Sequence, residues 1–191
     1  KSGVDICVLH RFKFWYYHMI DYLRQRKKSD EVYHSVDKSF DLTQLDIKNL
    51  VDLADQSERK RIRFCTHLSE KEIVYQKIIV HPKGAYVRPH KHTANSESIL
   101  VLEGEVDYVI FDENGDIDSI VRMGDYRSNK PFYQTIEPNL YHTLLIRSNW
   151  LIFLEVIEGP FLENDKIYSD WSPLESDRVE VAKYVDELFL K

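Results

Sequence analysis

Two histidines and a glutamate lie close together in the middle of the chain, at His90, His92 and Glu97. Residues two apart on a β-strand project to the same face, so a strand through this segment would hold both imidazoles side by side. The polar residues 93–96 are typical of a turn, and a reversal there would bring the Glu97 carboxylate into the same space. Nitrogen and oxygen ligands in this mixture suit a divalent transition metal, so the spacing predicts a metal site.

A third imidazole, His142, is a candidate for the fourth ligand. It follows Pro138 and Asn139 and opens an apolar run, as a strand does after a turn. After glycine, asparagine is among the residues that best tolerate the left-handed backbone of a tight turn. Three imidazoles and one carboxylate accept several first-row ions, so the ligand set predicts Fe, Mn, Ni or Zn without selecting among them.

The first three ligands stand between Gly84 and Gly104 in the order Gly-x5-His-x-His-x4-Glu-x6-Gly. This order resembles the first motif of the cupin family without a departure. The second cupin motif, Gly-x5-Pro-x-Gly-x2-His, is matched less well. A longer insert follows Gly124, Pro138 lies four residues before the histidine instead of five, and Asn139 replaces a glycine. The resemblance implies an all-β double-stranded β-helix, the jelly-roll barrel of the cupins.

Other segments narrow the resemblance to the WbuC family of cupin-fold metalloproteins, which are found with bacterial O-antigen and surface-polysaccharide genes. The match covers about residues 42–175 and leaves residues 1–40 outside. The segments that carry it are residues 57–61, His67, residues 85–92, 111–115, 141–143 and 153–160, Asp165, Lys166 and residues 171–173.

Composition limits the class of protein. With 43% hydrophobic residues among 191, the chain can form one domain with a sizeable core, and a net charge of -6 disfavours a nucleic-acid partner. The sequence has no apolar run of the roughly 20 residues needed for a membrane span and no signal-peptide pattern at its start, although it begins with Lys and not Met. Cys7 and Cys65, far apart and without a motif, predict free thiols in the cytoplasm.

Periodicity predicts the elements that must position the ligands. Helical spacing of apolar and aromatic residues over 8–26, followed by a basic cluster, indicates a helical extension at residues 1–40 that packs on the chain or a partner subunit, or lies on a membrane surface. A cupin domain follows at residues 41–175, with a helix that Asp46 caps and an Asn114-Gly115 type I′ hairpin. Ser172 and Pro173 signal the start of a last helix, and the C-terminal helix is assigned to residues 176–191. The predicted strands are residues 73–80, 85–88, 99–102, 106–111, 117–121, 143–146 and 151–157.

Strand alternation also selects candidate substrate-binding residues. If His90 and His92 face inward, Tyr86 and Arg88 do too, so Arg88 could bind a substrate anion or form a structural ion pair. Tyr86 is a candidate proton donor or a core tyrosine. The resemblance places a charged run near the barrel mouth, where it forms either a solvated surface or a cationic wall; its candidate anion-binding residues are Arg59 and Arg61.

Two further residues are candidates for moving a proton. Glu155 interrupts an apolar strand and is either the partner of a cation or a general acid/base, and His67 is the other candidate.

Three functions remain open: a metal-dependent enzyme such as an isomerase or epimerase that acts on an anionic sugar or nucleotide sugar in surface-polysaccharide synthesis, a metal-dependent dioxygenase, and a carbohydrate-binding or regulatory cupin without turnover. Since cupins commonly pair through sheet edges, the resemblance also implies a homodimer.

Overall fold

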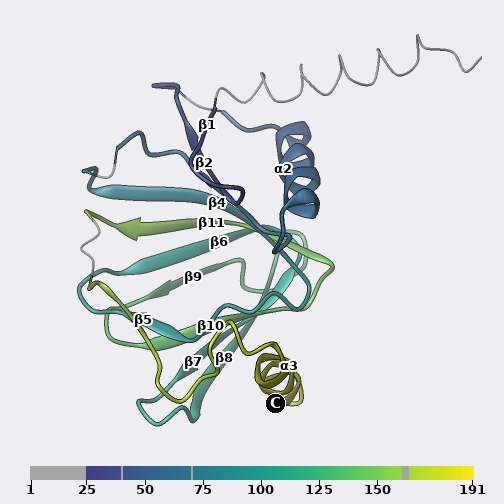
Figure 1. Cartoon of the computed structure of the whole chain (residues 1–191), viewed down its shortest axis with the longest axis vertical. Helices are drawn as coiled ribbons and strands as arrows, with labels where there is room; N and C mark the ends of the chain where they lie inside the picture. The colour runs from purple at the N-terminus through teal and green to yellow at the C-terminus, as the bar shows by residue number, and fades with distance from the viewer. Residues whose placement is uncertain (1–24, 40, 70, 161–163) are drawn as a thin grey trace, which may run out of the picture.

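Two β-sheets make up most of the described part of the chain, which comprises residues 25–39, 41–69, 71–160 and 164–191 of a computed structural model. In Figure 1 the sheets lie one above the other, with one helix beside the upper sheet and one beside the lower. The mostly β architecture that the sequence predicted is therefore confirmed.

The larger sheet has seven strands within the described residues. Their order is β1 (Gln25–Lys27), β2 (Val32–Ser35), β3 (Ile62–Cys65), β4 (Val74–Pro82), β11 (Trp150–Glu158), β6 (Glu97–Glu103) and β9 (Tyr133–Ile136). All neighbours are antiparallel except β2 and β3, which are parallel.

The smaller sheet has five antiparallel strands in the same part of the chain. Their order is β12 (Lys166–Tyr168), β5 (His90–His92), β10 (Tyr141–Ile146), β7 (Glu105–Phe111) and β8 (Ile117–Gly124). Several strands that follow each other in the chain, such as β5 and β6 or β10 and β11, lie in opposite sheets, which surround a shared interior.

Alternation along the strands sorts side chains between two cores. Ile79 and Phe153 face the interior between the sheets, where they pack in one cluster with Tyr108 and Ile146 of the opposite sheet. The intervening residues of the larger sheet face the other way and contact helix α2 (Gln44–Gln56), as Leu50 shows by its complete burial. Around β3, β4 and β11 the larger sheet is therefore buried on both faces, and its inward side chains line the space in which a site can form.

Helix α2 begins one turn earlier than predicted. Thr43 is the N-cap, and Asp46 closes a capping box by accepting a hydrogen bond from the Thr43 backbone N–H at 2.7 Å. Asp46 therefore supports the cap from the third helical position and is not the cap itself. Helix α3 (Arg178–Phe189) begins after Asp177, later than the start predicted at Ser172 and Pro173, and lies within the predicted helical range 176–191.

Part of the predicted N-terminal extension belongs to the larger sheet. The predicted helix over residues 8–26 falls almost entirely outside the described residues, but β1 and β2 lie within the first forty residues and are strands. The parallel pairing of Val32 with Arg63 and of His34 with Cys65 joins this segment to the domain. Neither of the helices that the structure describes is long and apolar enough to cross a membrane.

The hairpin between β7 and β8 differs in detail from the predicted type I′ turn. Gly115 has a φ of 92°, whereas Asn114 is not among the residues with positive φ. Phe111 pairs with Ile117, and Asp112 accepts hydrogen bonds from the backbone N–H groups of Asn114 and Asp116, both at 2.9 Å. The Asp112 side chain therefore organises a longer loop, in which only the glycine needs a left-handed backbone.

Gly104, the last glycine of the metal motif, links β6 in one sheet to β7 in the other. Its φ is 97°, and a Cβ added there would approach the Trp150 carbonyl oxygen. Both the backbone angle and the close contact require glycine at this position. The glycine thus sets the crossing between the sheets that follows Glu97.

Candidate metal centre

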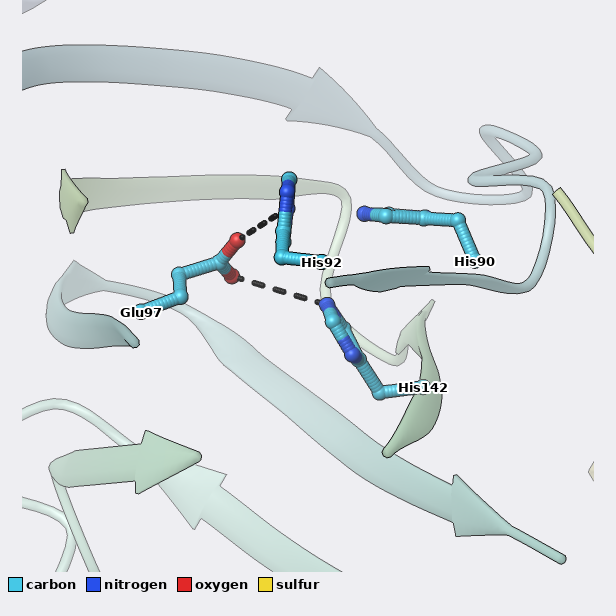
Figure 2. Close-up of side chains that lie close together, drawn as sticks. All are labelled: His90, His92, Glu97 and His142. Carbon is cyan, nitrogen blue, oxygen red and sulfur yellow. Dashed lines mark ion pairs between the residues drawn. The ribbon is translucent and has the colours of Figure 1, made fainter. Parts of the chain in front are cut away.

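Four side chains from three strands converge where the two sheets meet. His90 and His92 come from β5, His142 from β10 and Glu97 from β6, and Figure 2 shows their polar ends turned toward one another. One ligand atom of each lies within 4.8 Å of a ligand atom of every other, and all four side chains are buried. The structure therefore brings together the four residues that the sequence predicted as metal ligands.

Glu97 links two of the imidazoles. Its Oε2 lies 3.1 Å from Nε2 of His92, and its Oε1 lies 3.8 Å from Nε2 of His142 (Figure 2). His90 is the register partner of His142 across β5 and β10, and their ring centroids are 4.5 Å apart. The carboxylate from the larger sheet thus faces a group of three imidazoles from the smaller sheet.

Backbone contacts orient two of the rings. Nδ1 of His90 lies 2.8 Å from the Arg88 carbonyl oxygen, and Nδ1 of His142 lies 3.0 Å from that of Leu140. An imidazole that donates from Nδ1 to a carbonyl keeps its Nε2 lone pair for a metal. Nε2 of His142 is buried and makes no hydrogen bond to the described residues. The ligands therefore fit a divalent cation, which would satisfy both this nitrogen and the buried carboxylate.

Burial keeps the imidazoles in the form that binds metal. It lowers the pKa of His90 well below the ordinary value, with smaller contributions from neighbouring cations, and it lowers the pKa of His142 despite the opposing charge of Glu97. Neutral imidazole is the ligating species, so near pH 7 these two residues need not lose a proton when a metal binds.

The turn before His142 is fixed to the first ligand strand. Asn139 has a φ of 67°, the left-handed conformation that the sequence predicted for it. Its backbone N–H donates to the His92 carbonyl at 2.7 Å, and its side-chain amide donates to the Thr93 carbonyl at 3.2 Å. The departure from glycine is therefore accommodated, and the asparagine adds a side-chain contact to the β5 segment.

The four ligands lie in the wall of a cavity of about 610 Å³ between the sheets. Apolar side chains from both sheets, including Ile79 and Leu144, form part of the wall. The polar residues that share the cavity with the ligands are Lys28, Ser29, His34, Arg63, Cys65, His67, Tyr75, Lys77, His81, Glu155 and Lys166.

Glu155 lies in this wall as one half of an ion pair. Its Oε1 is 2.5 Å from Nζ of Lys77, its register partner on β4. Burial raises the pKa of the Glu155 carboxyl, but the combined charges of Lys77, Arg63 and Lys166 outweigh burial, and the net shift is downward. The carboxylate is therefore ionised near neutral pH, which makes it a poor proton donor; it can accept a proton, and the lowered pKa makes it a weaker base than an ordinary glutamate.

Lys166 is a cavity residue that the sequence did not single out as functional. It is the register partner of His92, and its side chain remains accessible from the cavity. Crowding by the surrounding protein, only partly offset by Glu155 and Glu97, lowers its pKa to about 8. Lys28, Arg63 and Lys77 are the other cavity cations that were not predicted as site residues. For Arg63 and Lys77 the available signal was their alternation with the buried Ile62, Phe64 and Ile78.

Of the remaining predicted site residues, only His67 and Glu155 line the cavity. Burial lowers the pKa of His67, so this imidazole is neutral near pH 7. Its Nδ1 lies 3.3 Å from the Gln76 carbonyl oxygen.

Arg88 and Tyr86 do not line the cavity, contrary to the prediction from strand alternation. Residues 85–89 do not form a strand, so alternation does not apply, and Val87 faces the cavity instead. Arg88 donates to the Ser169 carbonyl at 2.8 Å, and the Tyr86 hydroxyl donates to the Pro173 carbonyl at 2.9 Å. Both side chains thus attach the C-terminal segment to the domain.

Arg59 and Arg61 also lie outside the cavity. Arg59 pairs with Glu31 at 2.5 Å and with Glu175 at 2.9 Å, and Arg61 pairs with the same two carboxylates at 3.1 and 3.0 Å. Both precede β3, and only Arg63 is inside that strand. The two arginines therefore join separate segments of the chain through a partly exposed charge network.

His81 should make the stability of the protein depend on pH. It is buried against Phe153, and burial together with Arg61 and Arg63 lowers its pKa from 6.5 to about 3. Because the unfolded chain protonates first, the stabilising contribution is complete above pH 6.5 and declines as pH falls toward 3. Between pH 7 and pH 4.5 the free energy of unfolding of the unmodified protein should therefore fall by about 2 kcal/mol more than that of His81→Phe. Urea unfolding at the two pH values measures this difference. Equal losses in the two proteins would contradict this role.

A family model described as a domain of unknown function (DUF6016) matches residues 42–123. No curated protein matches the chain.

Several solved structures resemble it. One is a conserved protein with a double-stranded β-helix domain from Klebsiella pneumoniae, with 17% identity over 70% of this chain and 98% of the other and a TM-score of 0.47. A cupin-superfamily sugar phosphate isomerase from Silicibacter pomeroyi has 18% identity over 53% and 59%, with a TM-score of 0.40. Oxalate decarboxylase from Bacillus subtilis has 22% identity over 62% and 31%, with a TM-score of 0.43. The chain thus spans under a third of the decarboxylase and less than two thirds of the isomerase.

Proposed function

We propose that this protein is a metal-dependent cupin enzyme that acts on an anionic sugar derivative, a sugar phosphate or a nucleotide sugar, during surface-polysaccharide synthesis. One observation carries the proposal: the four-ligand cluster shares its cavity with four cationic side chains, those of Lys28, Arg63, Lys77 and Lys166. The resemblance to the WbuC family supports the pathway. An isomerisation or epimerisation suits the residues, because such a reaction needs an electrophile and a proton carrier but no oxidant.

The cavity suits a ligand of this size and charge. Its volume of about 610 Å³ is within the range of small-molecule sites, roughly 300 to 1,000 Å³. The protein as a whole has a net charge of -6, so a cationic cavity would locally reverse the repulsion that an anion meets elsewhere. Arg63 and Lys166 supply that charge in place of the arginines that the sequence suggested.

The residues of the chain divide the chemistry among them. His90, His92, Glu97 and His142 would hold an Fe, Mn, Ni or Zn ion, which when bound would polarise a carbonyl or hydroxyl oxygen of the sugar. Lys166 and Arg63 would bind the phosphate or carboxylate of the substrate. Glu155 would accept a proton from a sugar carbon, and Lys77 keeps that carboxylate ionised. Phe153 and Leu144 in the cavity wall would limit the access of water.

Lys166→Met should weaken the binding of a sugar phosphate by about 10-fold or more, since a hydrogen bond to a charged group contributes about 1.5 to 3 kcal/mol. Calorimetry on the metal-loaded protein measures this change. Lys91→Met is the matched control: it replaces a lysine on β5, paired with Glu113 outside the cavity, and should leave affinity unchanged. Equal affinity of the Lys166 variant, or equal binding of neutral and phosphorylated sugars, would contradict an anion site.

Turnover distinguishes this function from the other two. Metal-loaded protein should convert a member of a panel of sugar phosphates and nucleotide sugars, observed by NMR, without consuming oxygen, and Glu155→Gln should stop the conversion while retaining the metal. Conversion coupled to oxygen uptake would identify a dioxygenase. Saturable binding without turnover across the panel would identify a carbohydrate-binding module.

A further inference from the structure

A second group of potential metal ligands lies in the same cavity and is built by β2 and β3. It consists of His34, Cys65 and His67, which we name the β2–β3 cluster. One ligand atom of each lies within 4.8 Å of those of the other two, and the residues are only 6%, 3% and 6% exposed. None of them belongs to the four-ligand centre.

Strand pairing brings these residues together. His34 and Cys65 are register partners in the parallel pair of β2 and β3, and neighbouring strands are about 4.8 Å apart. His67 follows Cys65 by two residues, and the hydrogen bond from the Thr66 backbone N–H to the Gln76 carbonyl at 3.0 Å holds this segment beside β4. Three residues with nitrogen or sulfur ligands are therefore held by backbone pairing at one corner of the sheet.

The imidazole of His67 is oriented as in a metal-binding histidine. When Nδ1 donates to the Gln76 carbonyl oxygen, 3.3 Å away, Nε2 is left with a lone pair. Tyr75 packs against the same ring at a centroid distance of 4.2 Å. The His34 ring meets it edge to face at 5.4 Å and 86°, so the two imidazoles are not stacked in parallel. Two rings inclined in this way can direct nitrogen atoms to a common point.

The β2–β3 cluster is separate from the four-ligand centre. Register partners run across the larger sheet in the order His34, Cys65, Lys77, Glu155 and Ile99, from β2 to β6. Four strand spacings amount to on the order of 15 to 20 Å along the curved sheet, and Glu97 lies on that last strand. The Lys77–Glu155 ion pair lies between the two groups, and Glu155 offsets the charge of Lys77 beside Cys65.

We propose that His34, Cys65 and His67 form a second metal site, specific for a thiophilic ion of the Zn²⁺ class. Sulfur and imidazole ligands favour Zn²⁺ over the hard, oxygen-binding ions. Tetrahedral zinc has Zn–S and Zn–N bonds of about 2.3 and 2.0 Å, which place ligand atoms about 3.3 to 3.5 Å apart. From separations of up to 4.8 Å the ligand atoms therefore need to approach one another by up to about 1.5 Å, through side-chain rotation. Three protein ligands leave the fourth position open to the cavity, as in zinc sites that bind water or substrate. This site does not depend on the proposed function.

Titration of the metal-free full-length protein with Co²⁺ alone tests the site. Co²⁺ bound by a thiolate gives an intense sulfur-to-metal charge-transfer absorption that nitrogen and oxygen ligands do not give. The unmodified protein should bind two equivalents and show this absorption for one of them. Cys65→Ser should remove the absorption and one equivalent. Cys7→Ser, which replaces the other cysteine of the chain, should keep both.

The two sites are distinguished by variants in each. His90→Gln combined with His92→Gln should lose the equivalent without charge-transfer absorption and keep the thiolate-bound one, and His67→Gln should do the reverse. If Cys65→Ser does not fold, X-ray absorption spectroscopy of the zinc-loaded unmodified protein replaces it. The spectrum should show an average of about half a sulfur neighbour per zinc ion, because one of the two bound ions has one sulfur ligand. A single bound equivalent without sulfur coordination, or a charge-transfer absorption that persists in Cys65→Ser, would overturn the proposal.

Discussion

Replacement of both His90 and His92 by glutamine should abolish metal binding at the four-ligand centre while the β-sheets stay folded. The change removes two of four ligands, and amide groups do not replace imidazoles. Loss of an outer contact to a metal ligand typically costs 10- to 100-fold in affinity, so loss of two ligands should cost more than about 100-fold. Metal content measured in a Cys65→Ser background, where the β2–β3 cluster cannot contribute, should fall from one equivalent to none.

Lys91→Gln in the same background is the control for this experiment. Lys91 lies between the two histidines on β5, but it pairs with Glu113 and contacts the ring of Tyr141 outside the cavity. Its replacement should leave the metal content at one equivalent, and circular dichroism should show the same strand content in both variants. A full equivalent of metal in the double histidine variant would show that the ligands are elsewhere.

Lys77→Met should destabilise the protein by about 3 kcal/mol, because it leaves the Glu155 carboxylate buried without its principal partner. The pair is 13% and 18% exposed, and its ions are 2.5 Å apart. Removing one partner of a buried ion pair usually costs about 3 to 5 kcal/mol, and the loss here should lie at the lower end because Arg63 still stabilises the carboxylate. Combining Lys77→Met with Glu155→Gln should recover most of the loss. Chemical unfolding of the metal-free proteins measures these differences.

The surface pair of Lys130 and Glu105 provides the matched comparison. It has a similar separation of 2.7 Å but is 39% and 47% exposed, so Lys130→Met should cost less than about 1 kcal/mol. Equal losses in Lys77→Met and Lys130→Met would show that Glu155 does not depend on its partner. No recovery in the double variant would show that Lys77 contributes mainly through packing of its aliphatic chain.

The four-ligand centre could be predicted from the sequence because three of its ligands are local and the fourth, His142, follows a recognisable turn, although it reaches the site by the pairing of β10 with β5. His90 and His92 share a face by alternation, Glu97 follows a short turn, and Asn139 permits the backbone that places His142. The same local reasoning predicted α2 and most strands, since their apolar residues recur at helical or alternating spacing. It failed for residues 85–88, where alternation was assumed for a segment that is not a strand, and so misplaced Tyr86 and Arg88.

The rest of the cavity was decided by the tertiary structure. Arg63, Lys77 and Lys166 lie in three strands, β3, β4 and β12, that reach the cavity only when the sheets form, and of these β12 pairs with the ligand strand β5 across more than seventy residues of sequence. Arg59 and Arg61 share the charge and the parity of Arg63, yet Glu31 and Glu175 from distant segments bind them outside the cavity.

The β2–β3 cluster shows the same division most clearly. In the sequence, no motif surrounds Cys65, and His34 lies in residues 1–40, outside the segment that resembles the cupins. The parallel pairing of β2 with β3 makes them neighbours. Side-chain chemistry and local spacing are written in the sequence, whereas contacts between distant strands depend on the register of the whole sheet, which backbone hydrogen bonds and burial fix together.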